Sequence, residues 1–342
     1  TLDRSSAASD VYKRQSSLRM ATDSSDGHLP ALSKGSADKP LRILISWSPS
    51  SSGTEALDCA AWLSRTAATQ VRVISTVFQP WTTTSLTKLG GKYKKWFKAQ
   101  KEACAAATHA ALDEAGVPRS CWDDKPSLLV DGPSRPHLLT EMAKKFEADL
   151  IILGPNQAAP KGRFFAGSTA DTLLHYSPQP LGLVPRKVKL SKHGVTRFNF
   201  AITERSPRED HEMLAAAELA NRWNLPLRLL AFSAKGLLNT PSKDKHDMAL
   251  KLTAEWLEDS LAMLDRARDS IQEKFPELVV TSEIGSGAGW GGAVDSLKWK
   301  KGDLMLMAST PQGPIARVFL GSTATELLPH IRVPILVHPS CG

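Results

Sequence analysis

One eight-residue motif occurs twice in this chain of 342 residues. Residues 163–170 read RFFAGSTA and residues 317–324 read RVFLGSTA, so the shared glycines, Gly167 and Gly321, lie 154 positions apart. Each copy is followed by a Leu-Leu pair and by a short apolar run enclosed by two prolines. A tandem duplication explains this spacing and predicts two copies of one domain. A glycine and two hydroxyl residues before a helical pattern also present backbone N–H groups that can hold an anion.

The chain length agrees with the repeat spacing, because 342 residues predict about two domains of roughly 150 residues each. We assign the first domain to residues 40–187 and the second to residues 195–342, and the basic stretch Arg186–Thr196 is the expected linker between them. Residues 1–39 are rich in small and polar residues and lack a hydrophobic period, which predicts a disordered leader. Part of this leader is expected to be artefactual, since Asp10–Gln15 resembles a translated sequencing adapter and Met20 suits a true start.

Charge and cysteine content narrow the class of protein only in part. The net charge of +8 favours encounters with phosphates, nucleic acid or acidic partners, but it identifies no ligand. The four cysteines form no CxxC or Cys/His cluster, which predicts a reducing compartment and neither a disulfide framework nor a zinc site. The sequence contains no apolar run of about 18 residues and no secretory pattern. We therefore expect a cytoplasmic protein without a membrane partner.

Short β-rich runs alternate with longer helical patterns twice along the chain, and this order predicts parallel sheets with crossover helices. The strands expected in the first half are Leu41–Ser46, Val71–Val77, Ser127–Val130, Leu150–Leu153 and Leu181–Val184. Their counterparts are Phe198–Thr203, Leu227–Phe232, Val279–Ile284, Leu304–Met307 and Ile335–Val337. The main helices expected are Thr54–Thr66, Lys92–Ala115, Glu212–Trp223 and Leu250–Lys274. The sequence thus predicts an α/β fold with five strands in each half.

The loop after the fourth strand carries a specific resemblance. In the first half Gly154 follows an apolar strand, Gln157 stands three positions later, and Gly167 precedes Ser168. ATP-binding members of the universal stress protein family have Gly-x2-Gly-x9-Gly-[Ser/Thr] at this place. Each half of the chain resembles a domain of that family, with the middle glycine of the first loop replaced by Gln157.

The resemblance covers about residues 40–339 and implies a particular architecture. It implies two tandem Rossmann-like (HUP-type) domains, each a five-stranded parallel sheet of strand order 3-2-1-4-5 with helices on both faces. Family members commonly pair through the last strand. A tandem chain can make this pairing internally, with Leu181–Val184 against Ile335–Val337, which also covers two sheet edges. Further association into a homo-oligomer stays open.

The resemblance also implies ATP or a related adenine nucleotide as ligand, bound mainly in the first half. The residues expected to bind it there are Ser48, Gly154, Gln157, Arg163, Gly167, Ser168 and Thr169. Family members commonly have an Asp that contacts adenine where Ser48 stands, so a hydroxyl replaces a stronger acceptor. Gln157 keeps its N–H group but loses the freedom of glycine at positive φ, which weakens this site without excluding it.

The second half offers a poorer version of the same loop. Its candidate nucleotide-binding residues are Gly321, Ser322 and Thr323. Ala308 and Pro311 replace the two earlier glycines, and proline has no N–H group to donate. We therefore expect a weaker or absent second site. Two simpler roles stay open, namely helix N-caps for both Gly-Ser-Thr sequences, and a solvated charge or a contact between the halves for Arg163.

The segment Lys92–Lys98 interleaves lysines with aromatic rings, as nucleic-acid-binding surfaces do. Tyr93, Trp96 and Phe97 also fall at helical spacing, so we expect the rings to pack onto the sheet and expect no nucleic-acid partner. Trp47 lies near the strand edge where a ring can stack on a base, although burial against a loop is the alternative.

The sequence gives no pattern that supports catalysis. It contains no HExxH, no paired metal-ligand spacing and no Gly-x-Ser-x-Gly. We therefore expect a non-enzymatic stress-response protein that binds ATP as a regulatory module and acts on an unidentified protein partner. Two alternatives stay open: a nucleotide-free interaction module with drifted loops, and an enzyme related to the nucleotide α-hydrolases.

Overall fold

The computed structural model describes residues 35–36, 38–50, 53–78, 83–203, 207–235, 243–309 and 322–338. Within these ranges only the backbone is described for residues 83–89, 207–208, 234–235 and 243–253. Most of the predicted leader lies outside the described residues, and so do Pro311 and Gly321 of the second loop.

The first half places its strands within a few residues of the predicted positions. They are β1 (Leu41–Ser46), β2 (Thr69–Phe78), β3 (Trp122–Gly132), β4 (Leu150–Leu153) and β5 (Leu181–Leu183). The helices are α2 (Glu55–Ser64), α3 (Thr83–Ala115), α4 (Arg135–Phe146) and α5 (Ser168–Tyr176). All four residues of β4 are buried, as a strand covered on both faces requires.

The second half repeats this order of elements. Its strands are β6 (Arg197–Ala201), β7 (Leu227–Lys235), β8 (Val280–Ala288), β9 (Asp303–Ala308) and β10 (Ile335–His338). Its helices are α6 (Pro207–Arg222), α7 (Lys243–Lys274), α8 (Gly289–Asp295) and α9 (Ser322–Leu327). Two helices differ most in length between the halves: α2 has 10 residues and its counterpart α6 has 16, whereas α4 has 12 residues and its counterpart α8 has seven.

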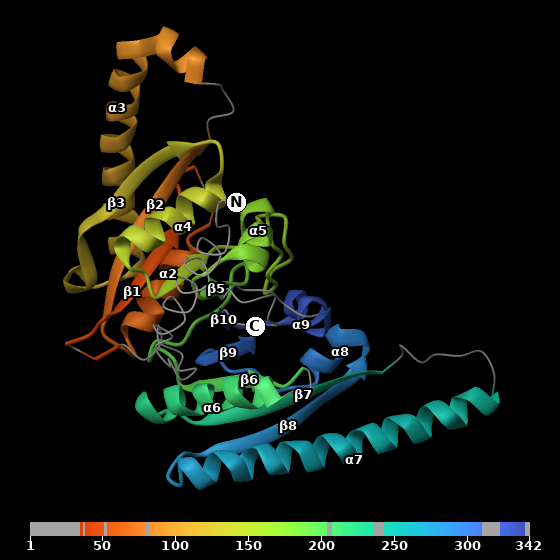
Figure 1. The fold of residues 1–342 in the computed structure, drawn as a ribbon. Coiled ribbons are helices and arrows are strands. Elements are labelled where there is room, and N and C mark those ends of the chain that lie inside the picture. The colour runs from red at the N-terminus through yellow and green to blue at the C-terminus, as the bar shows by residue number, and fades with distance from the viewer. Residues whose placement is uncertain are drawn as a thin grey trace, which may run out of the picture.

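The described strands form one ten-stranded sheet in the order β3-β2-β1-β4-β5-β10-β9-β6-β7-β8 (Figure 1). Each half therefore has the strand order 3-2-1-4-5, which confirms the predicted α/β, Rossmann-like fold. Within each half the strands pair in parallel. The halves join through an antiparallel pair, in which Leu181, Gly182 and Leu183 of β5 face Val337, Leu336 and Ile335 of β10. This is the pairing of last strands that the resemblance implied.

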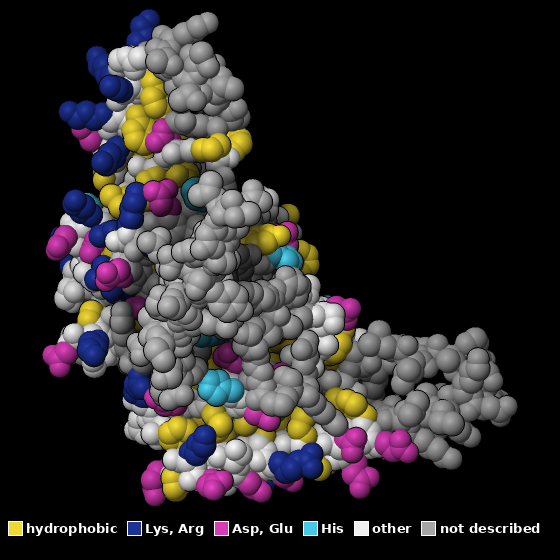
Figure 2. Space-filling model, viewed as in Figure 1, with side chains coloured by type: hydrophobic (Ala, Val, Ile, Leu, Met, Phe, Trp, Pro, Cys, Tyr) yellow, Lys and Arg dark blue, Asp and Glu magenta, His cyan; other side chains and the backbone are white. Residues whose placement is uncertain are grey.

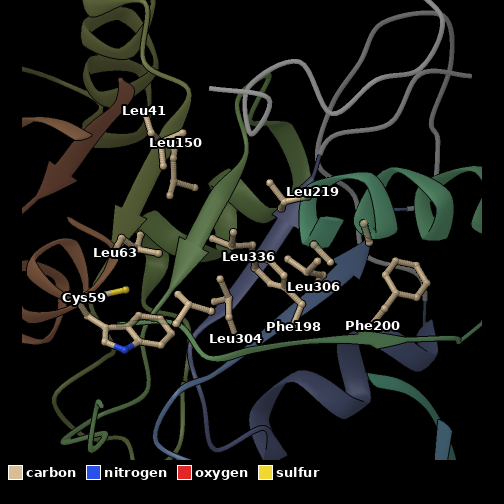
Figure 3. Packing of buried hydrophobic residues seen from close by; sticks show 14 of the residues in the cluster. Leu41, Cys59, Leu63, Leu150, Phe198, Phe200, Leu219, Leu304, Leu306 and Leu336 are labelled. Carbon is tan, nitrogen blue, oxygen red and sulfur yellow. The ribbon is translucent and has the colours of Figure 1, made fainter. Parts of the chain in front are cut away.

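Helices cover both faces of the sheet, and the core is continuous across the two halves. One face packs against α2, α3, α6 and α7, and the other packs against α4, α5, α8 and α9. Figure 3 shows side chains of the first face, where Phe198, Leu304, Leu306 and Leu336 of the second half cluster near the first-half residue Leu63. Because both clusters contain residues of both halves, each half shields apolar surface of the other from water.

The predicted linker is an ordered segment that touches both halves. The backbone N–H of Lys187 donates to Glu55 Oε1 at 3.0 Å, and the N–H of Val195 donates to Thr66 Oγ1 at 2.7 Å. On the other side, the N–H of Ser191 donates to the carbonyl of Lys301 at 2.9 Å. The connection is therefore fixed by hydrogen bonds along its length, and it does not act as a loose tether.

The aromatic segment of α3 departs from the prediction. The helix kinks at Gly90 (φ 39°) and projects beyond the edge of the sheet (Figure 1). Tyr93, Trp96 and Phe97 contact one another, and Trp96 keeps 46% of its surface exposed, so these rings do not all pack onto the sheet as expected. Figure 2 shows basic side chains spaced along this helix, all of which are lysines in its sequence. Among the α3 side chains that the structure describes, the buried ones are Cys104, Thr108 and Leu112, in the C-terminal half of the helix.

Candidate functional site

A cleft of about 330 Å³ opens at the carboxyl ends of β1, β2 and β4. This is the edge of an open α/β sheet where ligands bind, at the point where the strand order reverses. Strand β1 and the turn after it contribute Ser46, Trp47 and Ser48, and β2 contributes Ile74 and Thr76. The loop after β4 and the first residues of α5 form the opposite wall, and α2 and α4 close the two sides.

Six of the seven predicted first-half residues line this cleft. They are Ser48, Gly154, Gln157, Gly167, Ser168 and Thr169. They come from three separate segments of the chain, which the parallel sheet brings to one edge. The structure therefore assembles the predicted loop and the strand end into one site.

The start of α5 is the strongest polar feature of the cleft. Gly167 is the N-cap residue and has no side chain, so no side-chain acceptor satisfies the first N–H groups of the helix. Ser168 and Thr169 follow directly and line the cleft. A helix N-terminus with free N–H groups carries a partial positive charge and favours an anion.

Gly154 and Gly167 matter for the space they leave and not for unusual backbone angles. Gly167 has φ −83° and ψ 173°, and neither glycine has positive φ. A Cβ added at either position would meet no heavy atom within 4 Å among the described residues, so it would project into open space. In this loop the positive φ belongs to Gly162, at 75°. The positive φ expected of glycine in this loop is therefore not used at Gly154 or Gly167, and what these glycines provide is open backbone that a ligand can approach closely.

The turn after β1 is held by its own hydrogen bonds. Trp47 Nε1 donates to the carbonyl of Gly53 at 3.1 Å, and Ser75 Oγ donates to the carbonyl of Trp47 at 2.7 Å. The hydroxyls of Ser48 and Ser50 lie 2.9 Å apart. Trp47 is half-buried, bonds to the loop at Gly53 and lines the cleft, while its stacking on a base stays a prediction.

Two charged residues of the cleft were missed from the sequence, Glu55 and Arg135. Arg135 opens α4, is exposed, and has no hydrogen bond or ion pair with any described residue. Glu55 opens α2 and is only 8% exposed, and its Oε1 accepts from the N–H of Lys187. A Cβ on Gly53 would collide with Glu55 Oε2 and lie 2.7 Å from Gln157 Nε2, so both side chains crowd this glycine. Each of these charged residues is the first residue of a helix that follows a strand. This position in the sequence could have indicated that they lie at the cleft.

Arg163 is the one predicted first-half residue that does not line the cleft. Its guanidinium donates to the backbone carbonyl of His330, and its Nη2 lies 3.4 Å from both carboxylate oxygens of Asp295. Asp295 also accepts two 2.7 Å hydrogen bonds from Arg332. Arg163 therefore joins the β4–α5 loop to the second half, which corrects the expectation that it contacts a phosphate.

Charges around this contact shift two pKa values. The hydrogen bond from Arg332, opposed by partial burial and supported by Arg163, holds the pKa of Asp295 below its usual value. Burial, and then the positive charge of Arg163, lower the pKa of His330. At neutral pH the contact therefore consists of one carboxylate shared by two arginines, beside a neutral imidazole.

The second half places its predicted residues differently. Ser322 and Thr323 begin α9, which has six residues, and Gly321 lies outside the described residues. Thr323 lines a separate cleft of about 210 Å³, and Ser322 does not line it. Thr203, the counterpart of Ser48, donates from its hydroxyl to Glu209 Oε1 at 3.1 Å. Because Glu209 is buried and already paired with Thr203, the strand end here is closed by a side chain of the protein itself.

A metal-binding cluster and a membrane-spanning helix are both absent from the part of the chain that the structure describes. No group of three or more His, Cys, Asp or Glu side chains is placed to hold a metal ion in that part of the chain. No helix there combines the length and the apolar composition needed to cross a membrane.

Comparison with known proteins places this architecture in a family. The pattern of the universal stress protein family matches residues 41–185 and again residues 201–339. The universal stress proteins Rv2319c of Mycobacterium tuberculosis and Mb2346c of Mycobacterium bovis are each 29% identical over 305 residues, which span 87% of this chain and all of theirs. A crystal structure of a universal stress protein from Archaeoglobus fulgidus covers 87% of this chain and 97% of its own with a TM-score of 0.54. At 15% identity, that likeness shows the fold alone. The chain therefore belongs to the universal stress protein family and carries two of its domains in tandem.

Proposed function

We propose that this protein is a non-enzymatic, cytoplasmic member of the family that binds ATP or a related adenine nucleotide in the first cleft only. One observation carries the proposal: the uncapped N-terminus of α5, the open backbone at Gly154 and Gly167, and the unpaired Arg135 border the same cleft. Neutral ligands would leave both the helix N-terminus and the arginine without an anionic partner. A phosphate chain would use both.

The phosphate end is assigned to the β4–α5 side of the cleft. Backbone N–H groups at the start of α5 and the hydroxyls of Ser168 and Thr169 supply donors of the type that hold phosphate oxygens. Arg135 adds a charge-assisted contact, which is stronger than a neutral hydrogen bond. In this assignment Arg135 makes the phosphate contact that the sequence had led us to expect from Arg163.

The nucleoside end is assigned to the β1 side of the cleft. The hydroxyls of Ser48 and Thr76 and the free Oε2 of Glu55 can pair with ribose hydroxyls or with the adenine amino group. Trp47 offers an aromatic surface at the same edge. In this assignment Glu55 supplies the acidic acceptor that is absent from position 48. The volume of about 330 Å³ lies at the lower end of the range for small-molecule sites, roughly 300 to 1,000 Å³.

Binding without chemical turnover is the simplest use of these groups. The described lining of the cleft has two ionisable side chains, Glu55 and Arg135, and it includes no His, Cys or Lys to serve as nucleophile or base. Nucleotide occupancy would then signal through a change in shape or partner binding. A protein partner is part of this proposal.

A thermal-shift titration with ATP, ADP, AMP and inorganic phosphate tests the proposal. At a nucleotide concentration 100-fold above Kd, the free energy of unfolding should rise by about 2.7 kcal/mol. We expect the shift to grow from AMP to ATP, because the assigned contacts are mainly with phosphates. If no nucleotide shifts the melting temperature at millimolar concentration, the protein is a nucleotide-free interaction module. Steady product formation would instead identify an enzyme.

A further inference from the structure

The second cleft has the same place in its half as the nucleotide cleft has in the first, but a different lining. It lies at the carboxyl ends of β6 and β7, between α7, α8 and α9, and has a volume of about 210 Å³. Its described lining residues are Ile202, Thr203, Ala231, Phe232, Trp256, Ser260, Met263, Trp290, Thr323 and Leu327. None of these described side chains is charged, and three are aromatic.

The rings of this cleft are held in place by the surrounding elements. Trp290 stands at the start of α8, near the place where Arg135 stands in the first half, and its Nε1 donates to Glu326 Oε2 of α9 at 2.6 Å. Phe232 is buried on β7, and Trp256 is half-buried on α7. Aromatic walls fixed in this way suit a flat apolar ligand, because rings prefer stacked or edge-to-face contact.

One polar atom in the cleft lacks a partner. Ser260 is 1% exposed, and its Oγ is buried without a hydrogen bond to any described residue. The hydroxyl of Thr203, which follows strand β6, is already paired with Glu209. Burial of a hydroxyl without a hydrogen-bond partner costs free energy. A ligand that supplies this partner is therefore preferred over a ligand of the same shape that does not.

We propose that the second cleft binds a flat aromatic molecule that carries one hydrogen-bonding group, such as a hydroxyl, directed at Ser260 Oγ. A cavity of about 150 Å³ can hold benzene, so 210 Å³ leaves room for a fused second ring or a short substituent. The absence of a cation among the described lining residues disfavours a phosphate group. The proposal does not depend on nucleotide binding in the first cleft.

Two probes that differ by one hydroxyl test this directly, 2-naphthol and naphthalene. Binding to the full chain would be followed by NMR on the indole N–H signals of Trp256 and Trp290, assigned with Trp→Phe variants. We expect saturable binding of both probes, with 2-naphthol about 5- to 10-fold tighter, as one net hydrogen bond provides. Ser260→Ala should remove this preference and leave the affinity for naphthalene unchanged.

Two control variants keep the test specific. Ser270→Ala changes a serine elsewhere on α7, outside the described lining of the cleft, and should preserve the preference for 2-naphthol. Gly167→Val alters only the first cleft and should leave both affinities unchanged. The proposal is overturned if neither probe shifts the two indole signals below 1 mM, a limit that corresponds to about 4.1 kcal/mol of binding. It is equally overturned if Ser260→Ala leaves the ratio of the two affinities intact.

Discussion

The two clefts occupy equivalent places in a duplicated fold, yet their side chains favour different ligands. The first cleft has an uncapped nine-residue helix, two open glycines and an arginine without a partner among the described residues. The second has three aromatic side chains, a six-residue helix and a strand end closed by Glu209. The strands that support both clefts pair in the same order. Duplication thus preserved the sheet, while residues at its carboxyl edge changed without cost to the core.

The helix after the third strand shows how this divergence works. In the first half Ser134 caps α4, and Arg135 follows at the mouth of the cleft. In the second half the shorter α8 begins with Gly289-Trp290, and the indole bonds to Glu326. Where the first half has Arg135, which can bind a phosphate, the second half has the indole ring of Trp290, which is hydrogen-bonded to Glu326. In our proposal this difference at a helix start is one reason why the two clefts bind different classes of ligand.

Among the substitutions considered, Gly167→Val should cause the largest loss of affinity for ATP. The backbone angles at Gly167 suit any residue, and a Cβ there meets only open space, so we expect the fold to survive. The valine side chain would occupy the space in front of the first N–H groups of α5. We expect ATP affinity to fall at least about 100-fold, which corresponds to about 2.7 kcal/mol, measured by calorimetry.

The matched control for Gly167→Val is Gly91→Val, at a glycine of α3 that also has no heavy atom near its Cβ position. This variant should bind ATP like the wild type. If Gly167→Val keeps its affinity for ATP, the nucleotide does not sit on the α5 N-terminus.

A smaller loss of binding is expected for Arg135→Gln. The residue is exposed and unpaired among the described residues, so the substitution should not alter the stability of the protein without ligand. Loss of one charge-assisted contact costs about 1.5 to 3 kcal/mol, or roughly 10- to 100-fold in Kd for ATP. Arg163→Gln, which changes the arginine outside the cleft, provides the comparison and should weaken ATP binding much less. Equal losses would return Arg163 to the site.

The smallest effect concerns the contact between the halves. Asp295→Asn removes the carboxylate shared by Arg163 and Arg332. The pair is partly exposed and screened by solvent, so we expect a loss of about 0.5 to 1 kcal/mol in the free energy of unfolding at pH 7. Because the folded-state pKa of Asp295 is lowered, this stabilisation is present above its ordinary pKa of 3.8 and is lost as the pH falls through the folded value. Urea titrations should therefore show a larger difference between wild type and variant at pH 7 than at pH 3.

Hydrogen exchange separates this contact from ordinary surface charge effects. In Asp295→Asn we expect faster exchange of two amides of the loop that Arg163 anchors, that of Asn156, which donates to the carbonyl of Phe165, and that of Gly162, which donates to the carbonyl of Arg186. Asp113→Asn breaks an exposed pair with Arg119 inside the first half and should leave these two amides unchanged. Equal exchange in both variants would mean that Arg163 does not hold the loop.

The sequence predicted the fold better than the site, for physical reasons. Apolar runs such as Leu150–Leu153 have no stable place except a sheet covered on both faces, so the strands were found within a few residues. Strand β3 begins five residues earlier than predicted, since its first residues include the polar Asp123 and Lys125, and Asp123 is paired with Arg72. Polar residues at the start of β3 did not indicate a strand in the sequence, because the ion pair that satisfies Asp123 is formed only in the folded protein.

Most of the predicted loop residues line one cleft, whereas tertiary contacts hold Arg163 elsewhere. Gly154 and Gly167 were singled out because a bare loop before a helix has a local signature, and their part in binding stays a prediction. Arg163 was misplaced, since the same loop also makes the contact between the halves, and repetition of the motif does not separate these two roles. Glu55 and Arg135 belong to helices far from the loop in sequence, so only the folded sheet reveals that they share its cleft.

The central claim is that nucleotide binding is confined to one of two equivalent places. Isothermal titration calorimetry of the full chain with ATP measures this most directly, because it gives the number of sites per chain together with Kd. We predict one site per chain in the wild type and none in Gly167→Val. Two sites per chain, or one site that persists in Gly167→Val, would contradict the account.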